Sequence, residues 1–180
     1  MTTLTFFTVL VALVALERVA ELVVSTRNAR WSLARGGVET GQRHYLVMVV
    51  LHTGLLVGAL AEAWWRRPEV GVGLAGTMLA LVVAAQALRW WCISTLGRQW
   101  NTRVIVVPGR ELVHSGPYRF LPHPNYVAVV IEGFALPLVH AAWWTAVVFT
   151  VANAALLTVR IRVENSALVT VVQEPSCATS

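Results

Sequence analysis

Residues 70–88 read VGVGLAGTMLALVVAAQAL and contain no charged side chain. About 20 apolar residues in a helix, each rising about 1.5 Å, cross the hydrocarbon core of a bilayer, so this stretch predicts a membrane-spanning helix. Similar apolar runs lie on both sides of it along the chain. The sequence therefore predicts an all-α integral membrane protein of about five transmembrane helices, at about residues 4–24, 45–66, 70–92, 124–139 and 142–163.

The composition excludes an ordinary soluble domain. Hydrophobic residues make up 57% of the 180 residues and charged residues only 13%, whereas about a quarter of a typical soluble domain is charged. The length suits one domain, which we place at 1–172. Residues 173–180, QEPSCATS, follow the last apolar segment. They predict a disordered tail.

The distribution of charge predicts a topology. All 14 basic residues are arginines, and most of them lie in the two long loops at 25–44 and 89–123. Because basic loops stay in the cytoplasm, we expect both loops and the C-terminus inside and the N-terminus outside. The same rule explains the net charge of +5 without a nucleic acid partner. Cys92 and Cys177 lack metal-type spacing, so no metal site is expected.

Ionisable residues inside membrane spans are costly and are therefore candidate functional residues. Glu17 and Glu21 are four residues apart on one helical face, where they either form an interhelical ion pair or shape a pocket. Glu132 lies in the middle of the fourth span, on nearly the same face as Asn125. A buried carboxylate needs a partner. For Glu132 that partner is either Arg160, as a structural pair, or a substrate hydroxyl.

The fifth span carries a polar stripe. Asn153, Arg160 and Glu164 are spaced by seven and four residues, so they share one helical face. The last two alone could form a surface ion pair, but Asn153 extends the stripe deeper and favours a cavity between the fourth and fifth helices. In the second span, Glu62 is expected to pair with Arg66 four residues later.

The longest polar stretch, LVHSGPYRFLPHPNY at 112–126, ends where the fourth span begins. Pro124 suits the first turn of a helix, where its missing N–H has no cost, and this places His123 at the mouth of the span. The two tyrosines nearby could instead be interfacial anchors. Upstream, RVIVV at 103–107 predicts either one strand of a small hairpin with the segment that follows it or an extended loop.

The order of these motifs resembles the isoprenylcysteine carboxyl methyltransferase family, integral membrane enzymes that depend on S-adenosylmethionine, with phospholipid N-methyltransferases as more distant relatives. The family pattern is approximately LVxxGxYRxxRHPxY, a helical hairpin, and then RxxxEE. The matching residues here are Leu112, Val113, Gly116, Tyr118, Arg119, His123, Pro124, Tyr126, Arg160 and Glu164.

Two departures from the pattern fall within these blocks. Pro122 stands where the family has arginine, and Asn165 stands in place of the second glutamate. We take them to indicate a divergent acceptor. Residues 17–45 and GRQWNTR at 97–103 are similar to small bacterial members found beside type III polyketide synthases, which are implicated in O-methylating long-chain alkylpyrones or alkylresorcinols.

The resemblance implies S-adenosylmethionine as the cofactor, in a cytoplasmic pocket, and a lipophilic acceptor that comes from the lipid of a bacterial-type plasma membrane. Glu132 would be the catalytic base and Arg160 the cation that orients the acceptor. The implied cofactor-binding residues are Val113, His114, Gly116, Tyr118, His123, Pro124, Tyr126 and Glu164. The implied substrate-binding residues are Glu17, Glu21, Asn125 and Asn153.

The alternatives are carboxyl methylation of a prenylated cysteine, N-methylation of a lipid headgroup, and a non-enzymatic membrane transport or assembly protein. The last would spread polar residues through the whole membrane depth, whereas the polar groups here crowd toward one face. That one-sidedness favours an enzyme with a cytosolic cofactor. Nothing in the sequence specifies an oligomeric state.

Overall fold

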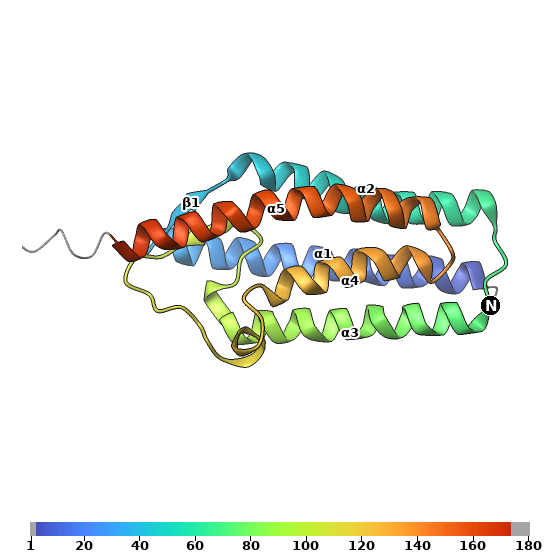
Figure 1. Ribbon diagram of the computed structural model, residues 1–180, viewed down its shortest axis with the longest axis horizontal. Helices are drawn as coiled ribbons and strands as arrows, with labels where there is room; N and C mark the ends of the chain where they lie inside the picture. The colour runs from blue at the N-terminus through green and yellow to red at the C-terminus, as the bar shows by residue number, and fades with distance from the viewer. Residues whose placement is uncertain (1–2, 174–180) are drawn as a thin grey trace, which may run out of the picture.

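The computed structural model describes residues 3–173, and long helices dominate them (Figure 1). Helices account for 78% of the residues, which confirms the predicted all-α class. Of the predicted tail, residues 174–180 lie outside the described residues, and Gln173 is the last residue of a helix. The long helices are α1 (Thr3–Leu33), α2 (Gln42–Arg66), α3 (Val72–Leu96), α4 (Pro124–Leu138) and α5 (Trp143–Gln173).

Within residues 3–173, three segments are long and apolar enough to cross a membrane, namely His44–Arg66, Val72–Gln99 and Trp143–Val169. They correspond to three of the five predicted spans, and they make the chain an integral membrane protein. The other two predicted spans, α1 and α4, lie alongside them in the bundle. α4 has only 15 residues, about 22 Å of helix, which is shorter than the roughly 30 Å of a hydrocarbon core.

α1 continues to Leu33, whereas hydropathy alone predicts its end near residue 24. Its last turns are polar, and the loop after α3 packs against them. The hydroxyls of Ser25 and Thr102 lie 2.7 Å apart, and the Asn28 amide donates to the Trp100 carbonyl at 2.7 Å. These bonds satisfy buried polar groups. The polar face therefore stays helical where the sequence alone predicted a loop.

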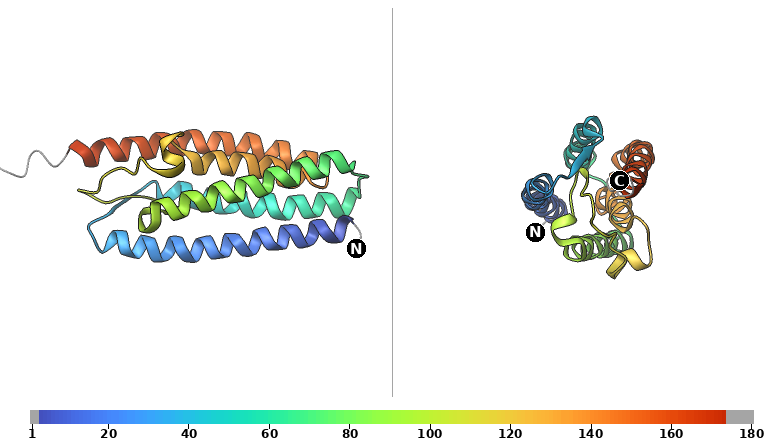
Figure 2. Two further views of the ribbon diagram at one scale, coloured as in Figure 1. Left: turned by 90° about the horizontal axis from the view of Figure 1, so that it is seen from below. Right: turned by 90° about the vertical axis from the view of Figure 1, so that its left-hand side faces the viewer.

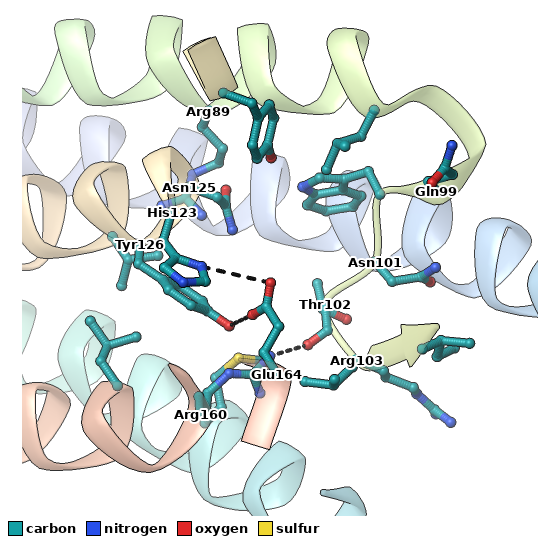
Figure 3. Close-up of a pocket in the computed structure, with 18 of the residues that line it drawn as sticks. Arg89, Gln99, Asn101, Thr102, Arg103, His123, Asn125, Tyr126, Arg160 and Glu164 are labelled. Atoms are coloured by element: carbon teal, nitrogen blue, oxygen red, sulfur yellow. Dashed lines mark hydrogen bonds and ion pairs between the residues drawn. The ribbon is translucent and has the colours of Figure 1, made fainter. Parts of the chain in front are cut away.

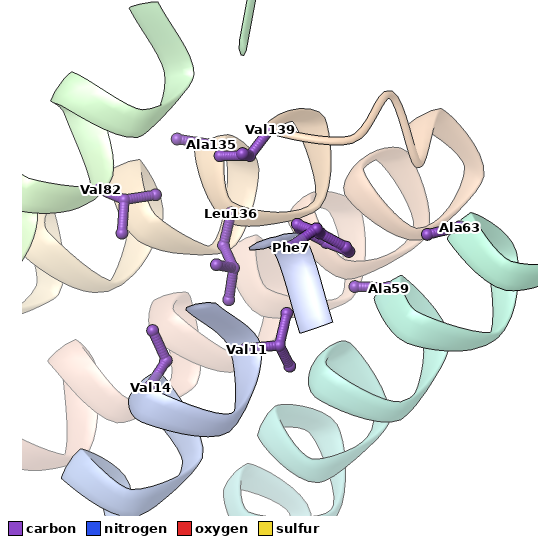
Figure 4. Close-up of a cluster of buried hydrophobic side chains, with 9 residues drawn as sticks. All are labelled: Phe7, Val11, Val14, Ala59, Ala63, Val82, Ala135, Leu136 and Val139. Atoms are coloured by element: carbon purple, nitrogen blue, oxygen red, sulfur yellow. The ribbon is translucent and has the colours of Figure 1, made fainter. Parts of the chain in front are cut away.

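The helices form a bundle in which α4 packs between α3 and α5 (Figure 2). Near the end that holds the N-terminus, a hydrophobic cluster joins α1, α2, α3 and α4 (Figure 4). Its members are small or medium apolar side chains apart from one phenylalanine. They are Phe7, Val11, Val14, Ala59, Ala63, Val82, Ala135, Leu136 and Val139.

The other end of the bundle carries two short strands. β1 (Val38–Thr40) pairs antiparallel with β2 (Val104–Val106), with Glu39 opposite Ile105. The stretch at 103–107 is thus extended, as predicted, but the hairpin alternative was wrong because β2 pairs with the α1–α2 loop instead. The ribbon ties that loop to the α3–α4 loop, which also contains the short helices η1 (Gly97–Gln99) and η2 (Gly116–Arg119).

Glu62 on α2 holds the first turn of α5 in addition to the predicted pair with Arg66, whose N–O distance is 3.5 Å. Its Oε2 accepts hydrogen bonds from the Thr145 backbone N–H at 2.8 Å and the Thr145 hydroxyl at 2.9 Å. Its Oε1 accepts one from the Trp144 N–H at 3.2 Å. Because the first N–H groups of a helix lack partners within it, Glu62 acts as a cap supplied by a neighbouring helix.

We expect Glu62→Ala to lower the free energy of unfolding by about 1–2 kcal/mol, as the loss of a helix cap does. Titration of detergent-solubilised protein with sodium dodecyl sulfate, followed by circular dichroism, measures this loss. The control is Arg66→Ala, which removes only an exposed ion pair and should cost less than about 0.5 kcal/mol. Equal losses for the two variants would contradict the capping role.

Candidate functional site

A cavity of about 710 Å³ lies in the half of the bundle near the β-ribbon. Cavities of about 300–1,000 Å³ are usual for small-molecule sites. All five long helices and the α3–α4 loop contribute to its wall. The wall mixes polar and apolar side chains: the loop contributes Asn101 and Thr102 among others, and α2 and α5 add apolar side chains that include Met48, Leu56 and Leu156. The cavity can therefore hold a ligand that has both polar and apolar parts.

Three side chains from the predicted motifs meet at the wall of this cavity (Figure 3). The Tyr126 hydroxyl donates to Glu164 Oε2 at 2.5 Å, and His123 Nδ1 lies 3.7 Å from Glu164 Oε1. The rings of His123 and Tyr126 stack with centroids 5.4 Å apart. His123 is the N-cap residue of α4, Tyr126 lies in the first turn of α4, and Glu164 lies on α5. The short α4–α5 connection therefore brings the two sequence blocks together.

Arg160 lies one helical turn before Glu164 and is 6% exposed. It does not pair with Glu132: its Nη2 donates to the Thr102 carbonyl at 2.8 Å, and its guanidinium lies 6.0 Å from the centre of the Tyr126 ring. Its Nε has no hydrogen-bond partner among the described residues. Arg160 is thus anchored by the α3–α4 loop while it keeps a free donor at the cavity.

Several buried polar atoms of the cavity wall lack partners among the described residues. They include both amide atoms of Asn101, Oδ1 of Asn125 and Oδ1 of Asn153. Since buried polar groups are normally hydrogen-bonded, these atoms mark positions where a polar ligand can bind. Asn125 and Asn153 were predicted as substrate residues. Asn101 and its neighbour Thr102 were missed as site residues, although they lie in the GRQWNTR segment that supported the resemblance.

The other predicted cofactor residues fall into two groups. Val113 and His114 line the cavity, whereas Gly116 and Pro124 shape the chain beside it. Gly116 has φ of +56°, and a Cβ there would lie 2.5 Å from Thr95 Oγ1, so both backbone conformation and space require glycine. Pro124 is the buried first residue of α4, as its position before an apolar run predicted.

Tyr118 also lines the cavity, where its phenol is partly buried. Burial raises the pKa of Tyr118 above its ordinary value, and the adjacent Cys92 thiol raises it further. The phenol is therefore protonated at neutral pH. It can donate a hydrogen bond to a ligand but does not supply an anion.

Glu132, the predicted base, is held by two arginines from other helices. Its Oε2 accepts hydrogen bonds from Arg18 of α1 and from Arg89 of α3, the latter at 2.5 Å. Its side chain is 5% exposed, and it is not among the described residues that form the cavity wall. The partner proposed from the sequence, Arg160, was wrong. Glu132 joins α1, α3 and α4 behind the wall.

Glu21 completes a buried cluster of four charges with Arg18, Arg89 and Glu132. Its Oε2 accepts a hydrogen bond from Arg18 at 2.5 Å, and its Oε1 lies 3.3 Å from Arg89 Nε. Unlike Glu132, the other three members line the cavity. Arg89 was missed as a site residue because it directly follows the uncharged run 70–88 and was counted with the arginines of the basic loop 89–123. It lies inside α3 and is 4% exposed.

Glu17 differs from Glu21 although the two share a helical face. Its carboxylate accepts hydrogen bonds from the Gln86 amide and from the Trp90 indole N–H, the latter at 2.6 Å. It does not belong to the described cavity wall. Of the four predicted substrate residues, Glu21, Asn125 and Asn153 therefore reach the cavity and Glu17 does not.

Apolar helices thus enclose a cavity whose wall combines polar and apolar side chains, as in the binding site of a membrane protein. Residues 78–170 match the sequence model of the isoprenylcysteine carboxyl methyltransferase (ICMT) family, and the chain belongs to this family. Members are membrane methyltransferases that use S-adenosylmethionine and act on lipophilic substrates. This membership supports methyltransferase activity for the chain and does not favour a transport or assembly role.

Similar proteins occur in several bacteria. Uncharacterized protein YpbQ of Bacillus subtilis is 36% identical over 171 residues, which cover 90% of this chain and 96% of that protein. An uncharacterized protein of Haemophilus influenzae is 26% identical over 165 residues, 91% and 95% of the two chains. The haem-binding subunit MsrQ of Agrobacterium fabrum is 37% identical over 59 residues, only 33% of this chain and 27% of that protein. No solved structure matches the chain.

Proposed function

We propose that this protein is an S-adenosylmethionine-dependent O-methyltransferase whose acceptor is a long-chain phenolic or pyrone lipid of the polyketide type. One observation carries the proposal, namely the Glu164 carboxylate held by Tyr126 and adjacent to His123 in the wall of the cavity. The arrangement places an acidic group from α5 beside the two residues of the family's His-Pro-x-Tyr motif. The match of residues 78–170 to the family supports the reaction class.

The residues present fit the cofactor. S-adenosylmethionine supplies a methyl group on a cationic sulfonium, and it also carries an amino acid and a nucleoside that need many hydrogen bonds. The Glu164 carboxylate provides charge complementary to a cation. The unpaired atoms of Asn101 and Arg160 provide further acceptors and donors. Among the predicted cofactor residues, those on the wall would contact the ligand, and Gly116 and Pro124 would position them.

The apolar side chains in the cavity wall suit a lipid acceptor. Apolar side chains of α2 and α5 contribute to the same wall as polar side chains of the loop, which supports an acceptor whose alkyl chain stays among the helices. Holding the acceptor in one geometry is the main catalytic requirement of a methyl transfer, because the reacting atoms must be collinear. Arg160, fixed by the Thr102 carbonyl, is the residue that we assign to orienting the acceptor oxygen.

We also propose that the cavity end of the bundle faces the cytoplasm of a bacterial-type plasma membrane, with the N-terminus outside. The arginines of the α1–α2 and α3–α4 loops lie at this end, whereas Arg66 and Arg67 lie at the other. That asymmetry supports the orientation by the positive-inside rule. A cytoplasmic opening would admit a water-soluble cofactor made in the cytosol.

Calorimetry of detergent-purified protein with S-adenosylmethionine tests the proposal. We expect wild type to bind, and Glu164→Gln to bind about tenfold more weakly or worse, because a hydrogen bond to a charged group contributes about 1.5–3 kcal/mol. Glu69→Gln, in the exposed α2–α3 connection at the far end, is the matched control and should bind as wild type does. Absence of binding by folded wild-type protein would overturn the methyltransferase assignment.

A further inference from the structure

One carboxylate oxygen in the cavity wall has no hydrogen-bond donor among the described residues. Glu21 is 3% exposed, and its Oε1 makes no hydrogen bond. Its nearest charged neighbour is Arg89 Nε at 3.3 Å, an ion pair whose geometry is not that of a hydrogen bond. Buried carboxylate oxygens normally accept hydrogen bonds. Because Glu21 lines the cavity, Oε1 can accept a hydrogen bond from a donor group on a bound ligand.

The neighbouring arginines hold the Glu21 carboxylate in a fixed position. Its other oxygen accepts a hydrogen bond from Arg18 at 2.5 Å, and Arg18 in turn bonds to Glu132. Arg89, the second arginine of the cluster, also donates a hydrogen bond to Glu132, at 2.5 Å. Every member of the cluster therefore has at least two charged neighbours. The carboxylate is preorganised, so a ligand does not have to spend binding free energy on ordering it.

The charge of the cluster determines which kind of donor group a ligand can place near Glu21 Oε1. Two arginines and two glutamates cancel formally, so the cluster is neutral overall. An ammonium group near Oε1 would meet two guanidinium groups, and a carboxylate group would meet Glu21 itself. Uncompensated charges in such a buried place are costly. A neutral hydroxyl satisfies Oε1 without adding charge.

We propose that Glu21 Oε1 accepts a hydrogen bond from a free phenolic or enolic hydroxyl of the lipid acceptor, and that this bond makes the site selective for hydroxyl-bearing lipids over their ethers. The inference rests on the proposed function, since it names the acceptor chemistry of the same cavity. An ether cannot donate, so its binding leaves Oε1 unpaired and buried. Sites built around a substrate hydroxyl discriminate strongly against analogues that lack it.

The test compares 5-pentylresorcinol with its dimethyl ether, titrated calorimetrically into detergent-purified protein without cofactor. Wild type should bind the resorcinol at least about tenfold more tightly, as expected for a hydrogen bond to a charged group. In Glu21→Gln this ratio should fall below about threefold. Glu17→Gln is the matched control, because Glu17 lies one turn away on the same helix with its carboxylate off the cavity wall. It should keep the wild-type ratio.

Two results would overturn the inference. One is that wild-type protein which binds S-adenosylhomocysteine binds the two compounds equally well or binds neither of them. The other is an unchanged ratio in Glu21→Gln, because the discrimination would then come from the size of the methyl groups. Failure of wild type to bind S-adenosylhomocysteine would instead overturn the proposed function, so the two failures are distinguishable.

Glu21→Asp replaces Glu21→Gln if the latter does not fold, as judged by thermal melting and S-adenosylhomocysteine binding. Aspartate keeps the negative charge between Arg18 and Arg89 but retracts the carboxylate by one methylene. The same fall in the binding ratio is expected. A wild-type ratio in a folded Glu21→Asp protein would overturn the assignment of Oε1.

Discussion

Glu132→Gln is expected to lower the free energy of unfolding by about 3–5 kcal/mol, the usual cost of removing one partner from a buried ion pair. The substitution keeps the volume of the side chain and removes its charge. Arg18 and Arg89 would then share Glu21 alone, and the buried cluster would carry a net positive charge. Titration with sodium dodecyl sulfate in mixed micelles, followed by tryptophan fluorescence and circular dichroism, measures the loss.

An exposed ion pair provides the matched control. Glu39 and Arg103 lie 3.4 Å apart with side chains 12% and 41% exposed. Glu39→Gln should cost no more than about 1 kcal/mol, because solvent screens such pairs. Adding Arg18→Met to Glu132→Gln removes one positive charge and should restore part of the lost stability. A cost below about 1 kcal/mol for Glu132→Gln would mean that the cluster does not hold the helices together.

The meeting of His123, Tyr126 and Glu164 could be predicted from the sequence because local rules determine it. A proline after His123 starts α4 at a known residue. The connection from α4 to α5 is short, so the two helices must lie antiparallel. Arg160 and Glu164 share a face because they are four residues apart. These constraints place the start of α4 beside the second half of α5 without any knowledge of the other helices.

The partners of Glu132 could not be predicted in the same way. Arg89 is 43 residues away in sequence and Arg18 is 114 residues away. Their meeting depends on how α1 and α3 pack against α4, and no local spacing encodes it. The pairing of β1 with β2 has the same origin, because a strand of three residues can pair with either of two neighbouring loops. Hydropathy also gave no role to Arg89, since a charged residue beside an apolar run is equally compatible with a helix end and with a buried pair.

α4 and α5 are so close at Gly133 that a larger side chain does not fit there. A Cβ at this position would overlap the Phe149 ring and would lie 2.5 Å from its Cδ1 atom. Phe149 is 3% exposed and contacts His52 edge-on, with ring centroids 5.4 Å apart, so the ring cannot avoid this overlap by turning into solvent. Close approach of two helices through a glycine is a common basis of membrane helix packing. Gly133 therefore sets the distance between the two helices that carry Tyr126 and Glu164.

We expect Gly133→Ala to lower the free energy of unfolding by about 3 kcal/mol, at the upper end of the usual cost of overpacking, and to weaken cofactor binding because α4 must move away from α5. The detergent titration and calorimetry described above measure the two effects.

Gly76→Ala on α3 is the control, since a Cβ there meets nothing within 4 Å. Because alanine has a higher helix propensity than glycine, this variant should leave stability unchanged or raise it by up to about 1 kcal/mol. Adding Phe149→Leu to Gly133→Ala should recover part of both losses, because it removes the ring atoms that collide. Wild-type stability in Gly133→Ala would show that α4 and α5 are not in close contact at this point, and the paired geometry of Tyr126 and Glu164 would then need another support.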